Sequence, residues 1–331
     1  MDTLAFEDVV PGTLDTPGAI TVTRDDIVAF GRAYDPQPFH VDEEAARDTP
    51  VGRLIASGWH SCCVLMRLNV DGWLGNSTSM GAPGLEEVRW ILPVLPGDTL
   101  RSRRTIRETK ASRSRPEMGL IHLHCELLNQ KDEVVLTQTN WIMLARRGVA
   151  VPPGRAPEQD APPPPPEPDD GGILVPFEDL EIGRKAMLGR HTFGADDIID
   201  FARRWDPQPF HIDPEAGRRS HFGALCASGW QTAALWMRAM VAHRERGREA
   251  ARARGLRPAR LGPSPGFKDL RWLKPVYPGD TITYRSEVVD KRPLASKPGW
   301  GLVFNRNTGD NQRGERVLEF TGAVFWERRA G

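Results

Sequence analysis

The chain has 331 residues, enough for about two domains of ordinary size. Hydrophobic residues make up 39% of it and charged residues 27%, a composition typical of soluble globular proteins. Lys plus Arg and Asp plus Glu balance at 44 each, which argues against a general affinity for nucleic acid or for an anionic membrane. No apolar run reaches the roughly 18 residues that a membrane span requires.

The first residues, MDTLAFED, lack the basic stretch and the apolar core of a secretion signal. The chain also contains few cysteines, and no two of them form a CxxC pair. This usage is typical of reduced, small core residues and predicts a cytoplasmic protein. The cysteines are Cys62, Cys63, Cys125 and Cys226.

A short helix is the first element that the sequence predicts with a clear boundary. Thr23 or a neighbour can cap it, and apolar residues three apart follow before it ends near Ala33. Pro36 and Pro38 then predict an irregular loop. Proline fixes its own φ, lacks a backbone donor and restricts the residue before it.

A second helix is expected from Ser57 to about Val70, and its apolar composition indicates that it is buried. Four strands should follow it, separated by turn sequences such as Pro-Gly-Asp. One helix against long antiparallel strands is an α+β layout. The expected strands are 86–94, 98–108, 119–129 and 133–145.

A proline-rich segment separates the two halves of the chain. Residues 152–172 include five consecutive prolines and almost no apolar side chains. This composition predicts an extended, semi-rigid connector with no packed structure. We therefore expect domains at 1–150 and 173–331, joined by a linker at 151–172.

The second half repeats the first. The sequence DPQPFH at 35–40 returns at 206–211, and ASGW at 56–59 returns at 227–230, both 171 residues later. Further on, RW-x-x-PV and PGDT return 182 residues later, so the second copy has gained 11 residues. The additional length falls in an Arg-rich stretch at 243–260. A repeat that keeps polar and titratable residues suggests that chemistry is kept in both copies.

Asp35 and His40 are the first candidate catalytic pair. They lie five residues apart across two prolines, so they cannot share one helical face, but a stiff loop can direct both at one point. A carboxylate and an imidazole that share one water form a general acid–base pair. Asp206 and His211 have the same spacing.

Gly58 is the candidate oxyanion donor, because it lies at the expected start of the buried helix. Backbone N–H groups at that end have no partner within the helix and favour negative charge. A glycine also lets a substrate carbonyl approach the backbone closely. Gly229 takes this place in the second copy, and Ser57 and Ser228 precede the two glycines.

These residues resemble the MaoC-like, (R)-specific enoyl-CoA hydratase family. That family has a motif of the form Asp-x-Asn-Pro-apolar-His-x5-small residue, and a glycine just downstream whose N–H holds the thioester oxygen. Here DPQPFH at 35–40 is followed after five residues by Ala46, and the copy at 206–211 is followed by Gly217. The candidate oxyanion glycines match the family's downstream glycine in both halves.

The resemblance covers nearly the whole chain outside the linker and implies a double hot-dog fold. In that α+β fold each repeat wraps a long antiparallel sheet around a central helix. The two sheets should pair side by side as an intramolecular pseudo-dimer, which single-domain relatives would form from two chains. Further self-association into a homo-oligomer stays open.

The chain departs from the family motif at two positions. Gln37 and Gln208 replace the usual Asn, and Ser57 and Ser228 stand where relatives often have His. Because both changes occur in both halves, they suggest a subgroup with its own substrate. The change to Gln could also rearrange the hydrogen bonds around the carboxylate.

The resemblance implies a hydro-lyase that reversibly hydrates a trans-2-enoyl thioester to the (R)-3-hydroxyacyl thioester, as in fatty acid metabolism. Asp35 and His40, or Asp206 and His211, would hold the water, and a Gly N–H would stabilise the enolate-like oxygen. No metal or redox cofactor is expected. The partner would be an acyl-CoA or an acyl carrier protein thioester.

Several alternatives stay open. His40 and His211 could instead be structural residues that bond nearby backbone, and Asp35, His40 and Asp42 could ligate a metal. Asp42 is better explained as a helix N-cap, because it precedes Glu-Glu-Ala-Ala. A thioesterase or a non-catalytic acyl-binding protein on the same fold would also fit.

Two surrounding features have two interpretations each. Trp59 and Trp230 are expected to be packing residues, with the lining of an acyl tunnel as the alternative. The stretch 244–260 holds seven arginines. It is expected to be a solvated helix with an Ala face, and the alternative is contact with the phosphates of coenzyme A.

Overall fold

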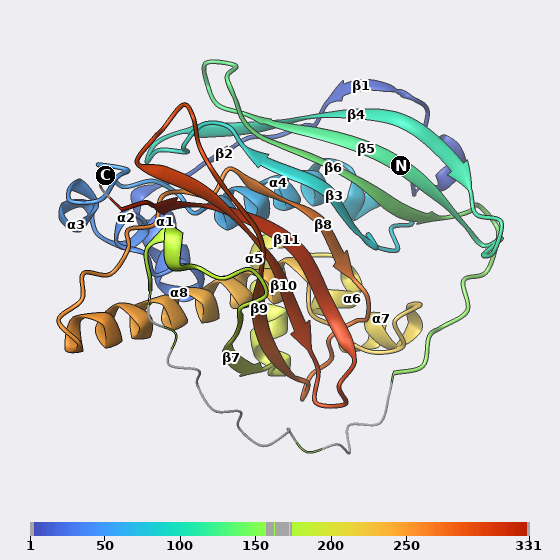
Figure 1. Cartoon of the computed structure of the whole chain (residues 1–331). Helices are drawn as coiled ribbons and strands as arrows, with labels where there is room; N and C mark the ends of the chain where they lie inside the picture. The colour runs from blue at the N-terminus through green and yellow to red at the C-terminus, as the bar shows by residue number, and fades with distance from the viewer. Residues whose placement is uncertain (1–2, 157–161, 163–171, 173, 330–331) are drawn as a thin grey trace.

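The computed structural model describes residues 3–156, 162, 172 and 174–329. Two α+β repeats lie side by side, and each has long antiparallel strands against a central helix (Figure 1). The predicted fold class, a double hot-dog, is confirmed.

The first repeat begins with short elements, continues with the buried helix α4 and ends with four strands. Its elements are η1 (Phe6–Asp8), β1 (Gly12–Asp15), β2 (Ile20–Thr21), α1 (Arg24–Tyr34), α2 (Pro38–Val41), α3 (Glu43–Arg47), α4 (Gly58–Gly72), η2 (Leu74–Asn76), β3 (Gly84–Trp90), β4 (Thr99–Ala111), β5 (Met118–Leu128) and β6 (Val134–Ala145).

The second repeat follows a similar order, with a longer central helix, α8. Its described residues form one strand, β7, where the first repeat has β1 and β2, and no counterpart of η2. Its elements are η3 (Phe177–Asp179), β7 (Lys185–Thr192), α5 (Ala195–Trp205), α6 (Pro209–Ile212), α7 (Pro214–Arg219), α8 (Gly229–Ala253), β8 (Gly266–Trp272), β9 (Thr281–Pro293), β10 (Trp300–Asp310) and β11 (Arg316–Glu327).

The two sheets form one sheet because β3 pairs with β8. In the described residues the strand order is β1-β4-β5-β6-β3-β8-β11-β10-β9-β7, with β2 paired to β4. Glycines stand at both ends of the β3–β8 pair, where Gly84 lies opposite Arg271 and Gly266 opposite Arg89. A Cβ at either glycine would lie 2.1 Å from a carbonyl oxygen of the facing strand. The repeats thus pair within one chain, as expected for a pseudo-dimer.

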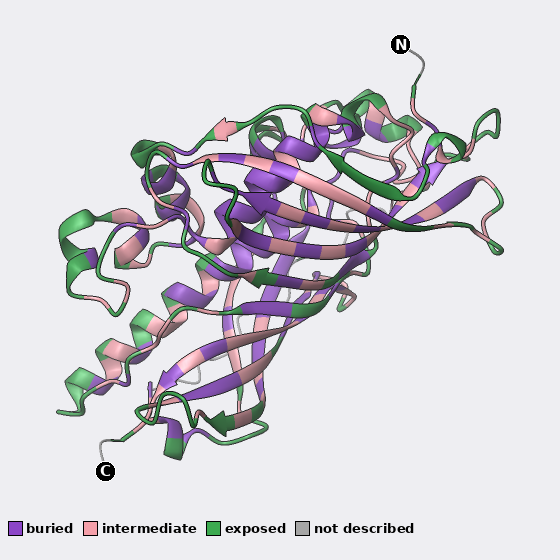
Figure 2. Cartoon of the chain, turned by 90° about the horizontal axis from the view of Figure 1, so that it is seen from above, coloured by how far each residue is buried: buried purple, intermediate pink, exposed green. Residues whose placement is uncertain are grey.

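The central helices α4 and α8 lie on one side of the sheet and contact each other. Ten of the fifteen residues of α4 are buried, which explains why its sequence is apolar on nearly every side. Burial alternates along the long strands, as Figure 2 shows, because successive side chains point to opposite faces. Each fully buried Leu of this core contributes about 1.5–3 kcal/mol.

The helix predicted after Thr23 is confirmed as α1. Thr23 accepts a hydrogen bond from the Asp26 N–H, and the Asp26 carboxylate accepts one from the Thr23 N–H. The prediction of an irregular loop after α1 is wrong from Pro38 onward. Pro38 opens the short helix α2, because the first helical position does not need an N–H. His40 therefore lies on a helical turn.

The four long strands were predicted in the right places, but the first of them ends at Trp90, four residues earlier than expected. The short strands β1, β2 and β7 were not predicted. All four residues of β1 are exposed, and β2 has only two residues, so neither shows an alternating pattern. β7 lies at the far edge of the sheet from β1.

The start of the predicted linker is packed, contrary to expectation. The Gly154 N–H donates to the backbone carbonyl oxygen of Ser220 over 3.0 Å. Val151 contacts the buried Met80 cluster, and Ala156 contacts a cluster that includes Phe210. A Cβ at Gly154 would lie 2.1 Å from a backbone oxygen, so the glycine permits this close approach. Most of the proline run lies outside the described residues.

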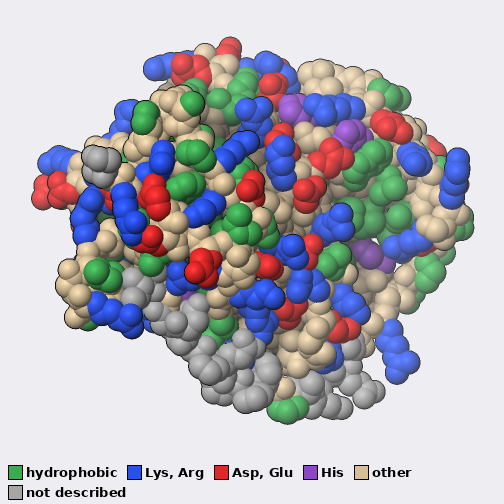
Figure 3. All heavy atoms as spheres, viewed as in Figure 1, with side chains coloured by type: hydrophobic (Ala, Val, Ile, Leu, Met, Phe, Trp, Pro, Cys, Tyr) green, Lys and Arg blue, Asp and Glu red, His purple; other side chains and the backbone are tan. Residues whose placement is uncertain are grey.

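Ten of the 11 additional residues of the second copy are accounted for by α8, which has 25 residues against 15 in α4. The far end of α8 carries many exposed side chains (Figure 2). On the face drawn in Figure 3, positive and negative side chains are interspersed. Within the described residues, no helix combines the length and apolar character needed to cross a membrane.

Candidate active site

Asp35 occupies the end of α1 and is 2% exposed. Its Oδ2 accepts a hydrogen bond from the Ser57 hydroxyl over 2.7 Å, and its Oδ1 accepts one from the Gln37 amide over 2.9 Å. His40, on α2, places its Nε2 3.3 Å from Oδ2. The carboxylate thus has three side-chain partners in a site almost closed to solvent.

The orientation of His40 is set by the backbone. Its Nδ1 lies 2.8 Å from the Ile55 carbonyl oxygen. A carbonyl can only accept, so Nδ1 carries a hydrogen and Nε2 is the nitrogen left to exchange a proton. That nitrogen faces Asp35. The structural role that was an alternative for His40 is therefore compatible with a role in catalysis.

The Asp35 carboxyl has a pKa below its usual value. Burial alone would raise this pKa, but the His40 imidazole and the hydrogen bonds from Ser57 and Gln37 outweigh burial. The group is therefore ionised at neutral pH, and it can accept a proton from a water held between it and His40.

Ser57 connects the carboxylate to the start of α4. Its Oγ accepts a hydrogen bond from the Trp59 N–H over 3.2 Å, as an N-cap does, while its hydroxyl hydrogen is donated to Asp35. The residue where relatives often have His thus fixes the helix end relative to the carboxylate.

Gly58 follows at the first position of α4 and lines the cavity. Its N–H donates no hydrogen bond to any other described residue, so it is available to a ligand. Its carbonyl accepts a hydrogen bond from Trp90 Nε1 over 3.0 Å. A Cβ at Gly58 would lie 2.3 Å from Trp90 Cε2, so packing also requires glycine here.

The second site repeats these distances. Asp206 accepts from the Ser228 hydroxyl over 2.7 Å and from the Gln208 amide over 2.9 Å. His211 Nε2 lies 3.5 Å from Asp206 Oδ2, and its Nδ1 lies 2.7 Å from the Cys226 carbonyl oxygen. At Gly229, a Cβ would lie 2.3 Å from Trp272 Cε2.

The two sites differ at the glutamines. Gln208 Oε1 also accepts a hydrogen bond from the Ser79 hydroxyl over 2.6 Å, so a residue of the first repeat fixes the second site. Leu261 aligns with Ser79 under the 182-residue offset and has no hydroxyl. Gln37 is accordingly more exposed than Gln208.

Each site opens into a cavity whose walls come from both repeats. Cavity 1, of about 410 Å³, contains Asp35, His40 and Gly58 of the first repeat. Its other walls come from α8, β10 and β11 of the second repeat: Trp236, Met237, Met240, Arg244, Asn305, Asn307 and Phe320.

Cavity 2, of about 460 Å³, inverts this arrangement. Asp206, His211 and Gly229 come from the second repeat, whereas α4, β5 and β6 of the first repeat provide the facing wall. These wall residues include Met66, Asn69, Leu123, Gln138, Asn140 and Ile142.

Both halves of the sequence match one protein family. The family's MaoC-like domain matches residues 6–121 and 180–299, which together make up more than half of the chain. The chain belongs to the MaoC-like dehydratase family.

Relatives and solved structures agree with this MaoC-like assignment. Mesaconyl-CoA hydratase of Cereibacter sphaeroides is 27% identical over 237 residues, which cover 66% of this chain and 64% of that protein. A MaoC domain protein of Chloroflexus aurantiacus has a TM-score of 0.77 at 19% identity, over 98% of both chains. A Mycobacterium tuberculosis protein described as a double hotdog has a TM-score of 0.69 at 17% identity, over 97% of this chain and 98% of its own. At these identities the two structures establish the fold alone.

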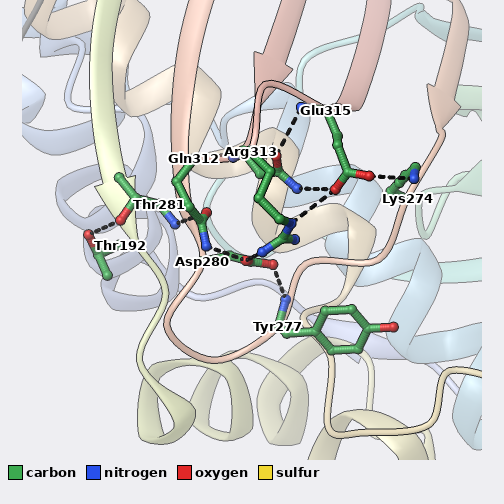
Figure 4. A network of polar contacts seen from close by, with 9 residues as sticks. Thr192, Lys274, Tyr277, Asp280, Thr281, Gln312, Arg313 and Glu315 are labelled. Atoms are coloured by element: carbon green, nitrogen blue, oxygen red, sulfur yellow. Dashed lines mark hydrogen bonds and ion pairs between the residues drawn. The ribbon is translucent and has the colours of Figure 1, made fainter. Parts of the chain in front are cut away.

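A network of charged groups supports the wall of cavity 2 in this MaoC-like chain (Figure 4). Asp280 accepts hydrogen bonds from the Tyr277 N–H over 2.8 Å and from Gln312 and Arg313 over 2.9 and 3.2 Å. Glu315 accepts from Lys274 and Arg313. Hydrogen bonds from Asn311, Lys274 and Arg313 lower the pKa of Glu315 to about 2, so it stays charged. Lys274 and Tyr277, which line the cavity, are thereby anchored.

The structure brings the eight predicted site residues together in two groups of four. Asp42 lies outside this arrangement and caps α3, where its carboxylate accepts from the N–H groups of Glu44 and Ala45. Among the described residues, no group of three or more His, Cys, Asp or Glu side chains could hold a metal ion. Trp59 and Trp230 are both buried, as expected of packing residues, and each also lines a cavity.

The wall residues of each cavity were not predicted, because they come from the opposite repeat. Arg244 was included in a stretch expected to be solvated, and for this residue the expectation is wrong: Arg244 lines cavity 1. The sequence did contain a signal for Arg244, namely the 11-residue difference between the copies. It marks the region in which the second central helix differs in length from the first.

Proposed function

We propose that this MaoC-like dehydratase reversibly adds water to trans-2-enoyl-CoA thioesters and forms (R)-3-hydroxyacyl thioesters. The observation that carries the proposal is the convergence of a carboxylate, an imidazole Nε2 and a helix-end glycine N–H on one cavity, twice in the chain; neither N–H donates to another described residue. The (R) configuration follows from the family resemblance. The proposal places the enzyme in acyl-CoA metabolism.

The proposed reaction uses Asp35 and His40 as partners. In the proposed cycle His40 starts with a proton on Nε2 as well as on Nδ1. Asp35 Oδ2 accepts a proton from the bound water as the water oxygen adds to the β-carbon, and His40 Nε2 delivers its proton to the α-carbon. A proton transfer from Asp35 to His40 restores the pair. The reverse sequence is dehydration. Such a pair contributes about 10²- to 10⁴-fold in rate.

Gly58 completes the proposed site. Its N–H would donate to the thioester oxygen, which gains negative charge as the enolate forms, and one such donor contributes about 3–4 kcal/mol. The same roles fall to Asp206, His211 and Gly229 in the second site. This chemistry requires neither a metal nor a redox cofactor.

The similarity to mesaconyl-CoA hydratase supports both the hydratase reaction and a CoA thioester as substrate. The similarity covers 64% of that protein, so its substrate is not transferred to this chain. An acyl carrier protein thioester would present the same reacting atoms.

Substitution of Asp35 and Asp206 by Asn, singly and together, tests the proposal. Crotonyl-CoA hydration is measured as the decrease in enoyl-thioester absorbance, and free thiol is measured in parallel. Each single variant should retain the turnover of the other site, and the double variant should lose about 10²- to 10⁴-fold.

Three results would contradict parts of this proposal. Release of free thiol without loss of the double bond would identify a thioesterase. Binding without turnover in the unmodified protein would identify an acyl-binding protein. Complete loss of turnover in either single variant would show that the two sites are not independent.

A further inference from the structure

Arg244 is a cation without a partner in cavity 1. It lies on α8 and lines the cavity together with Asp35 and His40. Within the described residues, it forms no hydrogen bond and no ion pair. Among the cavity-lining residues that the structure describes, Asp35 is the one acid and Arg244 the one Lys or Arg.

Arg244 shares one face of α8 with two apolar residues that also line cavity 1. Met237 and Met240 precede Arg244 on α8 by seven and four residues, which places the three on one face of the helix. Both methionines are buried. Burial and the nearby Arg248 charge together lower the pKa of Arg244 to about 10, although the Asp35 carboxylate raises it. Arg244 is therefore charged at neutral pH, and its side chain is only partly exposed to solvent.

Among the described residues that line cavity 2, none is a Lys or Arg of the central helix α4. Trp73 aligns with Arg244 under the 171-residue offset, and it is buried beneath Arg104 just after the end of α4. The next residue, Leu74, lines cavity 2. The cations that do line cavity 2 differ in kind: Lys274 is ion-paired with Glu315 over 2.6 Å, and Arg155 is exposed.

We propose that Arg244 binds a carboxylate at the far end of a short enoyl group, so that site 1 prefers dicarboxylic acyl thioesters and site 2 prefers neutral ones. This inference rests on the proposed hydratase function. A planar guanidinium pairs with a carboxylate through two hydrogen bonds. Such a ligand would remove the penalty of keeping an unpaired charge beside Met237 and Met240.

The location of Arg244 favours the acyl group over the phosphates of coenzyme A as the source of the anion. Asp35 marks the position of the reacting double bond, and Arg244 lines the same cavity of about 410 Å³. The phosphates of coenzyme A are separated from the thioester by the whole pantetheine arm. A carboxylate one or two carbons beyond the β-carbon has the shorter reach that this position requires.

The test compares Arg244→Gln with Arg252→Gln in the Asp206→Asn background, which isolates site 1. Arg252 lies on the same helix, and its side chain is 62% exposed. The substrates are fumaryl-CoA and crotonyl-CoA, which differ by a carboxylate in place of a methyl group, and the corresponding N-acetylcysteamine thioesters, which have no phosphate.

Arg244→Gln should lower the ratio of kcat/KM for the carboxylate substrate to that for the neutral one by about 10- to 100-fold on both carriers. Arg252→Gln should leave the ratio as it is in the background protein. An unchanged ratio in Arg244→Gln would overturn the inference. A loss that appears with both CoA substrates and vanishes with both N-acetylcysteamine substrates would also overturn it, because it would assign Arg244 to a phosphate.

A binding measurement separates this inference from the proposed function. Calorimetric titration with succinyl-CoA and butyryl-CoA, which have no double bond, does not depend on turnover. We expect Arg244→Gln to weaken succinyl-CoA binding selectively, by about 10- to 100-fold. Absence of hydration in the unmodified protein would refute the hydratase function alone, whereas equal weakening of both ligands would refute the role of Arg244 alone.

Discussion

The Ser57 hydroxyl donates to Asp35 Oδ2 over 2.7 Å while its oxygen caps α4. One side chain thereby holds both the proposed base and the helix end that carries the proposed oxyanion donor. The equivalent bond from Ser228 to Asp206 has the same length. This link replaces a residue that is often His in relatives, and it makes the relative position of base and oxyanion donor depend on one hydroxyl.

Ser57→Ala should therefore affect stability and pH dependence together. Loss of the cap and of a buried hydrogen bond should lower the free energy of unfolding by about 1–3 kcal/mol, measured by urea unfolding. The pKa of Asp35 should rise, because one of the groups that lower it is lost. Since the carboxylate is the active form, the acid limb of the site 1 rate profile should move to higher pH. Ser57→Thr, which keeps the hydroxyl, is the control. An acid limb that does not move in Ser57→Ala would contradict the inference that the Ser57 hydroxyl lowers the pKa of Asp35.

Gly58→Ala should destabilise the fold through Trp90. The added Cβ would lie 2.3 Å from the indole, and overpacking of this kind costs about 1–3 kcal/mol. Trp90→Leu in the same chain should recover part of the stability, because it removes the clash. Gly299→Ala is the control, since a methyl group added there would have no atom within 4 Å. Thermal unfolding measures all three, and full stability of Gly58→Ala would show that the indole can move.

His60 should make the protein sensitive to acid. Burial lowers its pKa to about 3, and its Nδ1 has no hydrogen-bond partner among the described residues. Between pH 6.5 and 3 the unfolded chain binds a proton that the folded chain does not, so stability is lost as pH falls below about 6.5. His60→Gln, which introduces the residue found at Gln231 in the second copy, should remove a slope that approaches about 1.4 kcal/mol per pH unit.

Urea unfolding at several pH values between 8 and 4 measures this slope. At pH 8 the two proteins should differ only through packing, because His60 is stacked on Phe30 and lies edge-on to Trp205. Equal slopes below pH 6.5 would mean that His60 becomes protonated in the folded state.

Ser79→Ala should weaken site 2 and leave site 1 as it was. The Ser79 hydroxyl donates to Gln208, which in turn donates to Asp206. Loss of one hydrogen bond should lower kcat/KM at site 2 by roughly 3- to 10-fold, measured in the Asp35→Asn background. The same substitution in the Asp206→Asn background is the control. Equal losses in both backgrounds would point to a general effect on folding.

The sequence was sufficient to predict the composition of each polar cluster, and the reason is local. Asp35, His40 and Ser57 come from segments close together in the chain, and the repeat preserved their spacing. The short elements α1 and α2 then bring them together. The same locality made the cap at Thr23 and the start of α4 predictable.

The cavity walls could not be predicted in the same way. Asn305 and Phe320 line the same cavity as Asp35, although more than 250 positions separate them from it in the sequence. The pairing of β3 with β8 brings the two repeats together. Nothing in the spacing of single residues encodes that contact. The short strand β1 was not predicted because its side chains are all exposed. The helix α2 was not predicted because Pro38 was interpreted as a residue of a loop, whereas proline is also favoured at the first position of a helix.

The β3–β8 pairing also bears on how such an enzyme can evolve. In a symmetric dimer of single repeats, every substitution appears in both active sites at once. Here each wall residue occurs once, so Arg244 can change cavity 1 while the aligned residue, Trp73, is not among the described residues that line cavity 2. Fusion of the repeats thus frees two formerly identical sites to diverge in the molecules they accept.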